Sequence, residues 1–368
     1  MLKALINATI FTGNETLAGK TILINNDRIE SIIDPGSIPK NYEVIDCGGN
    51  YIAPGLLDLQ IAGSGGFLFS AEPTAKALQA ITESIIKTGT TGFLIAIPTN
   101  SPDVYRNIIK TVKANPHPAV LGLHLEGPYI SPARKGAHMK DYLKHPIKDE
   151  LEALIKGAEG AVRMMTVAPE ICSGEIVRLL NDHGVVVAAG HSNATFREAA
   201  EGFKWGIKTT THLFNAMSQL HHRDPGLPGA TFETENIFAS IIADGIHVDY
   251  NTVSIAKKIM KDRLYLISDA VEENLHGSYQ HVKKHDRFTL PDGTLSGSKL
   301  TMLKAVRNCV EHVDIPLDEA LRMASAYPAR LINESDRGKI APGYRADLVV
   351  FNRDFEVKQV CLDGVFNF

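Results

Sequence analysis

The chain is short of cysteine, of one-sided charge and of long apolar runs. Its 368 residues include only four cysteines, and no two of them form a Cys-x-x-Cys pair. Such sparse spacing favours buried, reduced thiols over a disulfide framework. Lysine and arginine number 38 against 42 aspartates and glutamates, which gives a formal net charge of −4. Because there is no basic block, the charge gives no reason to expect nucleic acid or a membrane surface as a partner.

No stretch of the sequence approaches the roughly 18 consecutive apolar residues of a membrane-spanning helix. The first residues, MLKALINATIFTGNE, lack the apolar core and the small-residue cleavage site of a signal peptide. We therefore expect a cytoplasmic protein. With 44% hydrophobic and 22% charged residues, the composition is typical of a globular enzyme.

The two ends of the chain share a pattern that the middle lacks. Before residue 53 and again after residue 337, short β-branched stretches alternate with Gly, Asn and Asp turns, which predicts an antiparallel sheet. We expect one small β-sandwich domain made from residues 1–53 and 337–368. Residues 54–336 are then expected to form a second, larger domain.

The middle of the chain repeats an apolar run followed by an amphipathic stretch such as FREAAEGFKWG. Buried strands that alternate with surface helices form a parallel sheet, and eight such repeats predict a closed (β/α)8 barrel of the TIM type. A doubly wound open sheet is the alternative, but no Gly-x-Gly-x-x-Gly follows an early strand. The eight runs are residues 56–62, 93–99, 120–126, 162–168, 185–191, 209–215, 238–244 and 264–270.

Ionisable side chains stand at the ends of the later strands. They are Glu126, His191, His212, His247 and Asp269. In a barrel of this type the carboxyl ends of the strands meet at one face, where active sites lie. A polar group there is costly to bury unless it is paired or binds a metal. One such histidine alone is best explained as a satisfied core residue, but five ionisable residues together favour a shared site.

Two histidines and one glutamate are a ligand set suited to Zn²⁺, with one position left open for water. Fe²⁺, Mn²⁺ or Co²⁺ could occupy the same site, because availability also decides which metal binds. A bound metal lowers the pKa of water from about 15.7 towards about 7. Asp269 would then take the proton of the water and pass it to a leaving amine. A helix N-cap after the strand is the structural alternative for Asp269.

An ordered series of motifs covers essentially the whole chain. It consists of YIAPGLLDLQ at 51–60, then HLEGPYISPARKGAH, GHSNAT, THLFNAM, RDPGLPGA, ADGIHVD, ISDAV and TLSGSKLTM, and finally GKIAPGYRADLVVF. The series resembles the family of N-acetylglucosamine-6-phosphate deacetylases in the amidohydrolase superfamily. The resemblance implies a barrel of the metal-dependent hydrolase type. It also implies hydrolysis of the acetamido group of N-acetyl-D-glucosamine 6-phosphate to D-glucosamine 6-phosphate and acetate.

Roles for single residues follow from this resemblance. It implies that Glu126, His191 and His212 bind one divalent metal and that Asp269 is the catalytic acid and base. An arginine fork suits the oxygens of a phosphate, although the residues alone favour a solvated loop charge for Arg223. In this family the counterpart of that arginine can reach across a dimer interface, so a homodimer is expected. The residues expected to contact the sugar phosphate are Ala137, His138, Asn215, Ala216, Arg223, His247, Leu295, Ser296, Gly297 and Ser298.

The end of the first barrel strand departs from the superfamily pattern. Superfamily members commonly have His-x-His there, whereas this chain has Gln60 and Ala62. Alanine has no ligand atom and the glutamine amide is a weak ligand, so we predict a site with a single metal. We expect Gln60 to hydrogen-bond near the metal without binding it. The adjacent His221 and His222 cannot both face one site on a strand, and we expect them in a loop.

Two other functions stay open at this point. Another amidohydrolase, such as a D-amino-acid deacylase or a cyclic amidase, usually carries the His-x-His pair and often a bridging carboxylated lysine. The presence of Glu126 at a ligand position argues against that alternative. A metal-free interaction protein on the same barrel is suggested by the missing pair. The three candidate ligands together with Asp269 argue against it.

Overall fold

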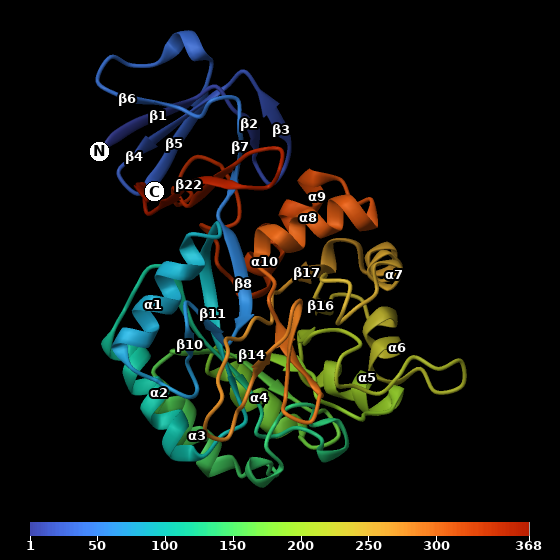
Figure 1. The fold of residues 1–368 in the computed structure, drawn as a ribbon. Helices are drawn as coiled ribbons and strands as arrows, with labels where there is room; N and C mark the ends of the chain where they lie inside the picture. The colour runs from blue at the N-terminus through green and yellow to red at the C-terminus, as the bar shows by residue number, and fades with distance from the viewer. Residues whose placement is uncertain (368) are drawn as a thin grey trace.

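Eight parallel strands in the middle of the chain form a barrel in which neighbours in sequence are also neighbours in space (Figure 1). The computed structural model describes residues 1–367. A parallel bridge between Ile61 and Ala270 links the first strand to the segment after the last one. The predicted TIM-type fold is therefore confirmed. The strands are β8 (Leu56–Ile61), β11 (Thr90–Pro98), β12 (Val120–Glu126), β13 (Val162–Val167), β14 (Val186–Ala189), β15 (Thr209–Thr210), β16 (Phe238–Ile241) and β17 (Leu264–Leu266).

Amphipathic helices cover the outside of the barrel, because the strands are apolar on both faces. In α2, for example, Tyr105, Ile108, Ile109 and Val112 are buried at helical spacing, and the Ser101 hydroxyl caps the first turn. The helices are α1 (Ala75–Ile86), α2 (Pro102–Ala114), α3 (Lys148–Ala158), α4 (Gly174–Asp182), α5 (Phe196–Trp205), α6 (Gly226–Glu233), α7 (Tyr250–Met260), α8 (Met302–Val313), α9 (Leu317–Met323) and α10 (Ala326–Leu331).

Short strands lie in the loops that follow the carboxyl ends of the barrel strands. A three-stranded antiparallel sheet separates β17 from α8, and its last strand supplies residues that line the central cavity. The strands concerned are β18 (Val282–Lys283), β19 (Arg287–Thr289) and β20 (Leu295–Ser298), together with the hairpin β9 (Gly63–Ser64) and β10 (Phe67–Leu68). Single 3-10 turns are η1 (Pro35–Ser37), η2 (Pro132–Arg134), η3 (Lys140–Tyr142) and η4 (Lys261–Arg263).

Both ends of the chain build two further sheets above the barrel in Figure 1. In the larger sheet, β7 lies between β2 and β21, so the two ends of the chain pair directly. Their apolar faces enclose a second core that includes Leu5, Ile24, Ile52 and Leu348. The strands are β1 (Leu2–Ile6), β2 (Thr9–Phe11), β3 (Thr16–Ala18), β4 (Thr21–Asn25), β5 (Arg28–Ile33), β6 (Glu43–Asp46), β7 (Tyr51–Pro54), β21 (Leu348–Phe351), β22 (Val357–Leu362) and β23 (Val365–Asn367).

The terminal sheets confirm the expected small β domain and correct one detail. The prediction of an antiparallel sheet is wrong for two pairs, because β1 runs parallel to β6 and β2 runs parallel to β7. The connection after β5 contains η1 and is long enough to return the chain in the same direction. The domain limits at 53/54 and 336/337 stay a prediction. Within residues 1–367, no helix is long and apolar enough to cross a membrane.

Candidate metal centre and active site

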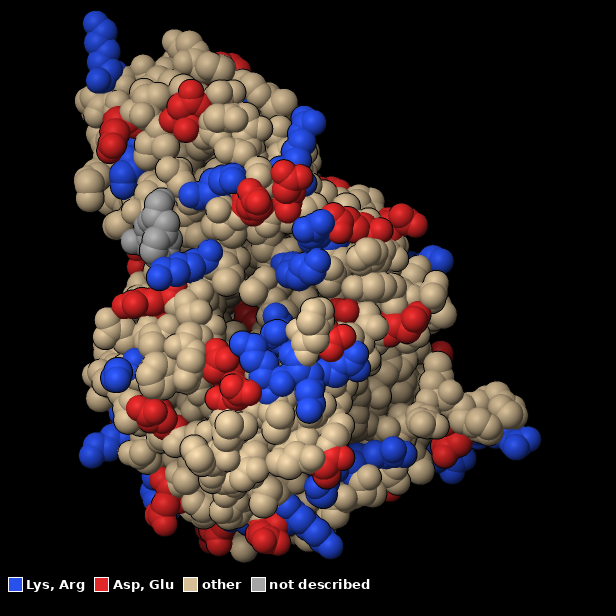
Figure 2. All heavy atoms as spheres, viewed as in Figure 1, with Lys and Arg blue, Asp and Glu red and all other residues tan. Residues whose placement is uncertain are grey.

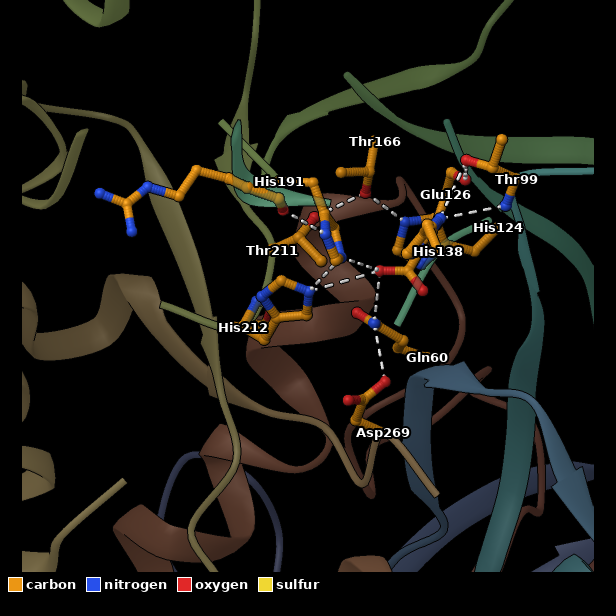
Figure 3. A network of polar contacts seen from close by, with 12 residues as sticks. Gln60, Thr99, His124, Glu126, His138, Thr166, His191, Thr211, His212 and Asp269 are labelled. Carbon is orange, nitrogen blue, oxygen red and sulfur yellow. Dashed lines mark hydrogen bonds and ion pairs between the residues drawn. The ribbon is translucent and has the colours of Figure 1, made fainter. Parts of the chain in front are cut away.

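Three side chains from three strand ends converge at the mouth of the barrel (Figure 3). Glu126 is the last residue of β12, while His191 and His212 follow β14 and β15. The Nε2 atom of His212 lies 3.0 Å from Nε2 of His191 and 3.4 Å from Oε1 of Glu126. Nε2 of His191 lies 3.6 Å from the same Oε1 atom. The exposed fractions of the three residues are only 4–7%, so the cluster is buried.

The backbone turns sharply where these side chains leave their strands. His191 and His212 have φ angles of 45° and 35°, and Asp269 has a φ angle of 50°. Left-handed backbone is uncommon for residues other than glycine, and each instance costs on the order of 1–3 kcal/mol when the neighbouring structure enforces it. Three strained residues at the ends of three barrel strands are consistent with a functional site at this face.

A hydrogen bond outside the cluster fixes which ring nitrogen of His191 carries the proton. Nδ1 of His191 donates to the carbonyl oxygen of Arg134 at 3.1 Å, because a carbonyl can only accept. In the neutral ring, Nε2 of His191 is therefore unprotonated and directs its lone pair towards Nε2 of His212 and the Glu126 carboxylate. Two imidazole nitrogens and one carboxylate oxygen are a ligand set of the kind that binds divalent transition metals. The residues therefore fit a divalent metal ion.

Opposite electrostatic effects act on the two acids of the site. Burial by itself raises the pKa of Glu126, but hydrogen bonds and charge interactions with His191 and His212 outweigh burial and hold this pKa well below its ordinary value. Burial, and then the negative charge of Glu126, raise the pKa of Asp269 to about 7. A cation beside Asp269 would lower its pKa again, since it favours the charged form. Glu126 is thus suited to bind a cation and Asp269 to exchange a proton near neutral pH.

Gln60 connects these two acids (Figure 3). Its Nε2 donates to Oε1 of Glu126 at 2.8 Å and to Oδ1 of Asp269 at 2.9 Å. The prediction that Gln60 hydrogen-bonds at the site is therefore confirmed. The amide reduces the repulsion between the two carboxylates and fixes the position of Asp269 relative to the ligands.

Sequence reasoning missed two polar residues beneath the site. His124 in β12 bonds through Nδ1 to the Leu59 carbonyl at 3.0 Å and through Nε2 to the Thr166 hydroxyl at 2.7 Å. The Asp58 carboxylate of β8 accepts hydrogen bonds from the backbone and hydroxyl of Ser268. Each lies two positions before a site residue on the same strand, so both side chains point to the barrel interior. That alternation is the signal that would have found them.

The cluster of Glu126, His191 and His212 opens into a cavity of about 280 Å³. Asp269 lines it together with most of the residues expected to contact substrate. Those residues are Ala137, His138, Asn215, Ala216, His247, Leu295, Ser296 and Gly297. Ser298 is not among the lining residues, since its buried hydroxyl donates to the Ser268 carbonyl at 2.6 Å. Tyr279 and His281, just before β18, and Thr294, in the turn between β19 and β20, also line the cavity; they were not predicted, because the β18–β20 sheet was not expected.

Two histidines in this cavity have defined protonation sites. Nδ1 of His138 accepts from the backbone N–H of Thr99 at 3.2 Å, so the proton of the neutral ring lies on Nε2. Burial lowers the pKa of His138 well below its ordinary value and keeps the ring neutral. Nδ1 of His247 lies 2.6 Å from Oδ2 of Asp244, which orients the ring and leaves Nε2 for the cavity. Both rings can therefore present a nitrogen to a bound molecule.

Arg223 lies away from this cavity. It belongs to an exposed hairpin in which His221 and Asp224 pair through two backbone hydrogen bonds of 3.1 Å. In Figure 1 the hairpin projects from the barrel next to α5 and α6. His221 and His222 lie in this loop, as predicted, with their rings exposed to solvent. The guanidinium of Arg223 does not line the cavity of its own chain.

Comparisons with known proteins now identify the family. A model of the amidohydrolase family matches residues 51–366, and a model of the NagA composite domain matches residues 3–52. The N-acetylglucosamine-6-phosphate deacetylase of Haemophilus influenzae is 33% identical to this chain, and the alignment covers 99% of each. The chain belongs to the N-acetylglucosamine-6-phosphate deacetylases of the amidohydrolase family.

Solved structures of this family agree with the fold over the whole chain. The crystal structure of N-acetylglucosamine-6-phosphate deacetylase from Pasteurella multocida superimposes with a TM-score of 0.96 at 32% identity and covers 100% of both chains. A mutant of the Mycobacterium smegmatis deacetylase, in complex with N-acetyl-D-glucosamine-6-phosphate, gives a TM-score of 0.92 at 29% identity over 99% of both chains. The family relationship therefore includes the terminal sheets as well as the barrel.

The ligand geometry predicts how metal content responds to substitution. We expect His191→Ala and His212→Ala each to lose most of the bound divalent metal on dialysis, because two ligands are too few for a stable site of this type. His222→Ala removes an exposed histidine from the projecting hairpin and should retain the metal content of the unmodified protein. Elemental analysis by mass spectrometry measures the metal per chain. Equal content in all three variants would show that this cluster is not the metal site.

Proposed function

We propose that this protein hydrolyses N-acetyl-D-glucosamine 6-phosphate to D-glucosamine 6-phosphate and acetate. The observation that carries the proposal is the convergence of Glu126, His191, His212 and Asp269 in one cavity. This cavity lies in a chain that matches relatives named for the reaction over its full length. In a metal-free interaction protein nothing would offset the free-energy cost of burying this set of polar groups.

We propose that Glu126, His191 and His212 hold one divalent metal, with Zn²⁺ as the first choice and Fe²⁺, Mn²⁺ or Co²⁺ as alternatives. When bound, the metal supplies Lewis-acid polarisation of the acetyl carbonyl and makes a nearby water more acidic. The end of the first barrel strand supports a site for one ion and not two, because Ala62 there offers no ligand atom. Gln60 points its amide N–H group, a donor and not a ligand, between Glu126 and Asp269.

In this proposal Asp269 moves the proton. Gln60 holds Oδ1 of Asp269, so Oδ2 is the oxygen available to the proton of the attacking water. As the water oxygen bonds to the carbonyl carbon, that proton passes to the carboxylate. Asp269 then returns the proton to the amide nitrogen, the C–N bond breaks, and acetate and the free amine leave. His247 and His138 line the cavity and are placed to hydrogen-bond the oxyanion or the sugar.

Polar groups around the cavity support a phosphorylated sugar as the substrate. The side-chain Nδ2 of Asn215 is buried without a hydrogen-bond partner among residues 1–367, and Asn215 lines the cavity. We assign it, with Ala216, Ala137 and the segment from Leu295 to Gly297, to substrate binding. Figure 2 shows lysine and arginine side chains gathered over the β18–β20 sheet. A basic surface next to the cavity attracts a phosphate dianion.

Arg223 is proposed to bind the phosphate in the cavity of a second subunit. Its hairpin extends away from its own barrel and also exposes Leu220, which is 52% accessible. An exposed apolar side chain on a projecting loop is suited to an interface. The protein would then work as a homodimer in which each subunit completes the site of the other.

The reaction itself is tested by acetate release. We expect acetate from N-acetyl-D-glucosamine 6-phosphate, loss of activity with a chelator, and recovery when a divalent metal is added back. Unphosphorylated N-acetylglucosamine should react at least about tenfold less efficiently, because the phosphate contacts are lost. N-Acetyl-D-amino acids and cyclic amides serve as comparison substrates. Failure to release acetate from the sugar phosphate with any added divalent metal would overturn the proposal.

Asp269→Asn tests the proton transfer. We expect kcat to fall by about 10²–10⁴-fold with KM nearly unchanged, since asparagine is nearly isosteric but cannot accept the proton. Asp34→Asn, at an exposed ion pair with Lys20, should leave both constants unchanged. Steady-state kinetics on both variants gives the comparison. Retention of more than about a tenth of the original kcat would contradict the role of Asp269.

Arg223→Ala tests the shared site. Loss of one charged hydrogen bond, about 1.5–3 kcal/mol, should raise KM for the phosphorylated sugar by roughly 10- to 150-fold. Arg197→Ala removes an exposed arginine on α5 and should change KM little. The same KM increase for the unphosphorylated sugar would show that Arg223 does not contact the phosphate.

Mixing variants separates binding in the same subunit from binding across subunits. A hybrid of an Arg223→Ala subunit and an Asp269→Asn subunit contains one complete site if Arg223 acts in the partner. At a substrate concentration well below KM, where the Arg223→Ala variant is weakly active, an equal mixture after subunit exchange should therefore show about a quarter of the original activity. No gain over the separate variants would place Arg223 outside the partner's cavity.

A further inference from the structure

A buried carboxylate lies beneath Asp269, and the proposed mechanism gives it no task. Asp58 precedes Gln60 by two residues in β8, and its exposed fraction is only 2%. Its Oδ1 accepts from the backbone N–H groups of Gln60 and Ser268, each at 3.2 Å, and its Oδ2 accepts from the Ser268 hydroxyl. Burial raises the pKa of Asp58 to about 6, while these three hydrogen bonds oppose the effect of burial. Because a carboxylate is costly to bury, a task beyond filling the barrel interior is expected.

Ser268 links this carboxylate to the backbone on both sides of Asp269. The Ser268 hydroxyl accepts from the backbone N–H of Ala270 at 3.1 Å, so one side chain spans the residue between them. The backbone N–H of Asp269 itself donates to the Gln60 carbonyl oxygen at 2.9 Å. Asp269 has a left-handed φ angle of 50°, a conformation that persists only where the surrounding structure enforces it. These hydrogen bonds supply that enforcement.

The same carboxylate also sets the position of Gln60 (Figure 3). The amide Nε2 of Gln60 donates to Oδ1 of Asp269 at 2.9 Å, which leaves Oδ2 for the proton in the proposed reaction. The strand of Gln60 and the turn at Asp269 both hydrogen-bond to Asp58, so this carboxylate fixes the two groups relative to each other. A displacement of about 1 Å at a catalytic group can slow a reaction about 10²-fold. Small changes at Asp58 should therefore affect the proton transfer.

We propose that Asp58 is a positioning residue: through Ser268 it holds the Asp269 carboxylate in the orientation that proton transfer requires. This inference rests on the proposed function, because it gives Asp269 the same task. Asp58 is not among the residues that line the cavity, so it acts through Asp269 and not on the substrate. The alternative is a structural link that only ties β8 to the segment after β17. Such a link would affect stability, and its effect on kcat would not depend on the carboxylate of Asp269.

Two substitutions weaken this anchor while removing little volume. Asp58→Asn offers the three donors one acceptor oxygen in place of two, and Ser268→Ala removes the hydroxyl that spans Asp269. We expect each to lower kcat for acetate release by about 10- to 100-fold with KM nearly unchanged, because the substrate contacts stay intact. The metal content per chain should equal that of the unmodified protein, since no proposed ligand is changed.

Matched controls make the same substitutions at buried positions that do not line the cavity. Ser325→Ala removes a buried hydroxyl that donates to the Leu321 carbonyl at 2.6 Å. Asp347→Asn changes a buried acid that pairs with Arg337. Both controls should lower Tm and leave kcat nearly unchanged. Circular dichroism and the Tm of all four variants show whether kcat follows stability.

A double-variant cycle with Asp269→Asn separates positioning from structural support. Once Asp269 can no longer accept a proton, the addition of Asp58→Asn should lower the residual kcat by less than about twofold. The crystal structure of Asp58→Asn gives a readout that does not depend on turnover. We expect the Asp269 carboxylate to move by more than about 0.5 Å relative to Gln60, with Glu126 in place.

Several outcomes would overturn the proposal. They are an unchanged kcat in Asp58→Asn and Ser268→Ala, an equal loss when Asp58→Asn is added to either background, and an Asp269 carboxylate that stays in place in the crystal structure. Loss of bound metal would also contradict it, since the effect would then lie at the ligands. If the unmodified protein releases no acetate, the proposed function fails, whereas the crystal structure still tests whether Asp58 holds Asp269.

Discussion

The arrangement at the mouth of the barrel depends on the cost of burying two carboxylates and two imidazoles together out of water. Two imidazole nitrogens and the carboxylate of Glu126 face one another at 3.0–3.6 Å, and the carboxylate of Asp269 lies just beyond. Such groups are stable together out of water only if a cation or a proton donor lies among them. Gln60 supplies donors on one side, and a divalent metal would supply the positive charge on the other.

This constraint explains several features around the site. Left-handed backbone at His191, His212 and Asp269 turns their side chains inward immediately after the strands end. His124 and Asp58 are hydrogen-bonded beneath the site, so the polar atoms of these two buried side chains have partners within the barrel. The strain is tolerated because the eight-stranded barrel and its helices hold the strand ends in place. Rigid strands position the site, while loops shape the cavity above it.

Much of the fold and of the candidate metal site could be predicted from the order of residues. Periodicity located all eight strands, and the polar residues that end them marked the site. The run from 209 to 215 shows the limit of this reasoning, because only Thr209 and Thr210 lie in the ladder. After them the chain turns at His212 and Phe214, where φ is positive. A run of apolar and β-branched residues does not reveal where hydrogen bonding to the neighbouring strand stops.

The sequence by itself determined the barrel and the small domain formed from both ends, and it predicted the three residues of the Glu126, His191 and His212 cluster, because alternation and strand-end chemistry are local properties. Tertiary structure alone decided that Gln60 bridges Glu126 and Asp269, since these residues come from three different strands or strand ends. It also decided that Arg223 lies outside its own cavity. Distances between segments far apart in the chain depend on packing, which no local pattern records.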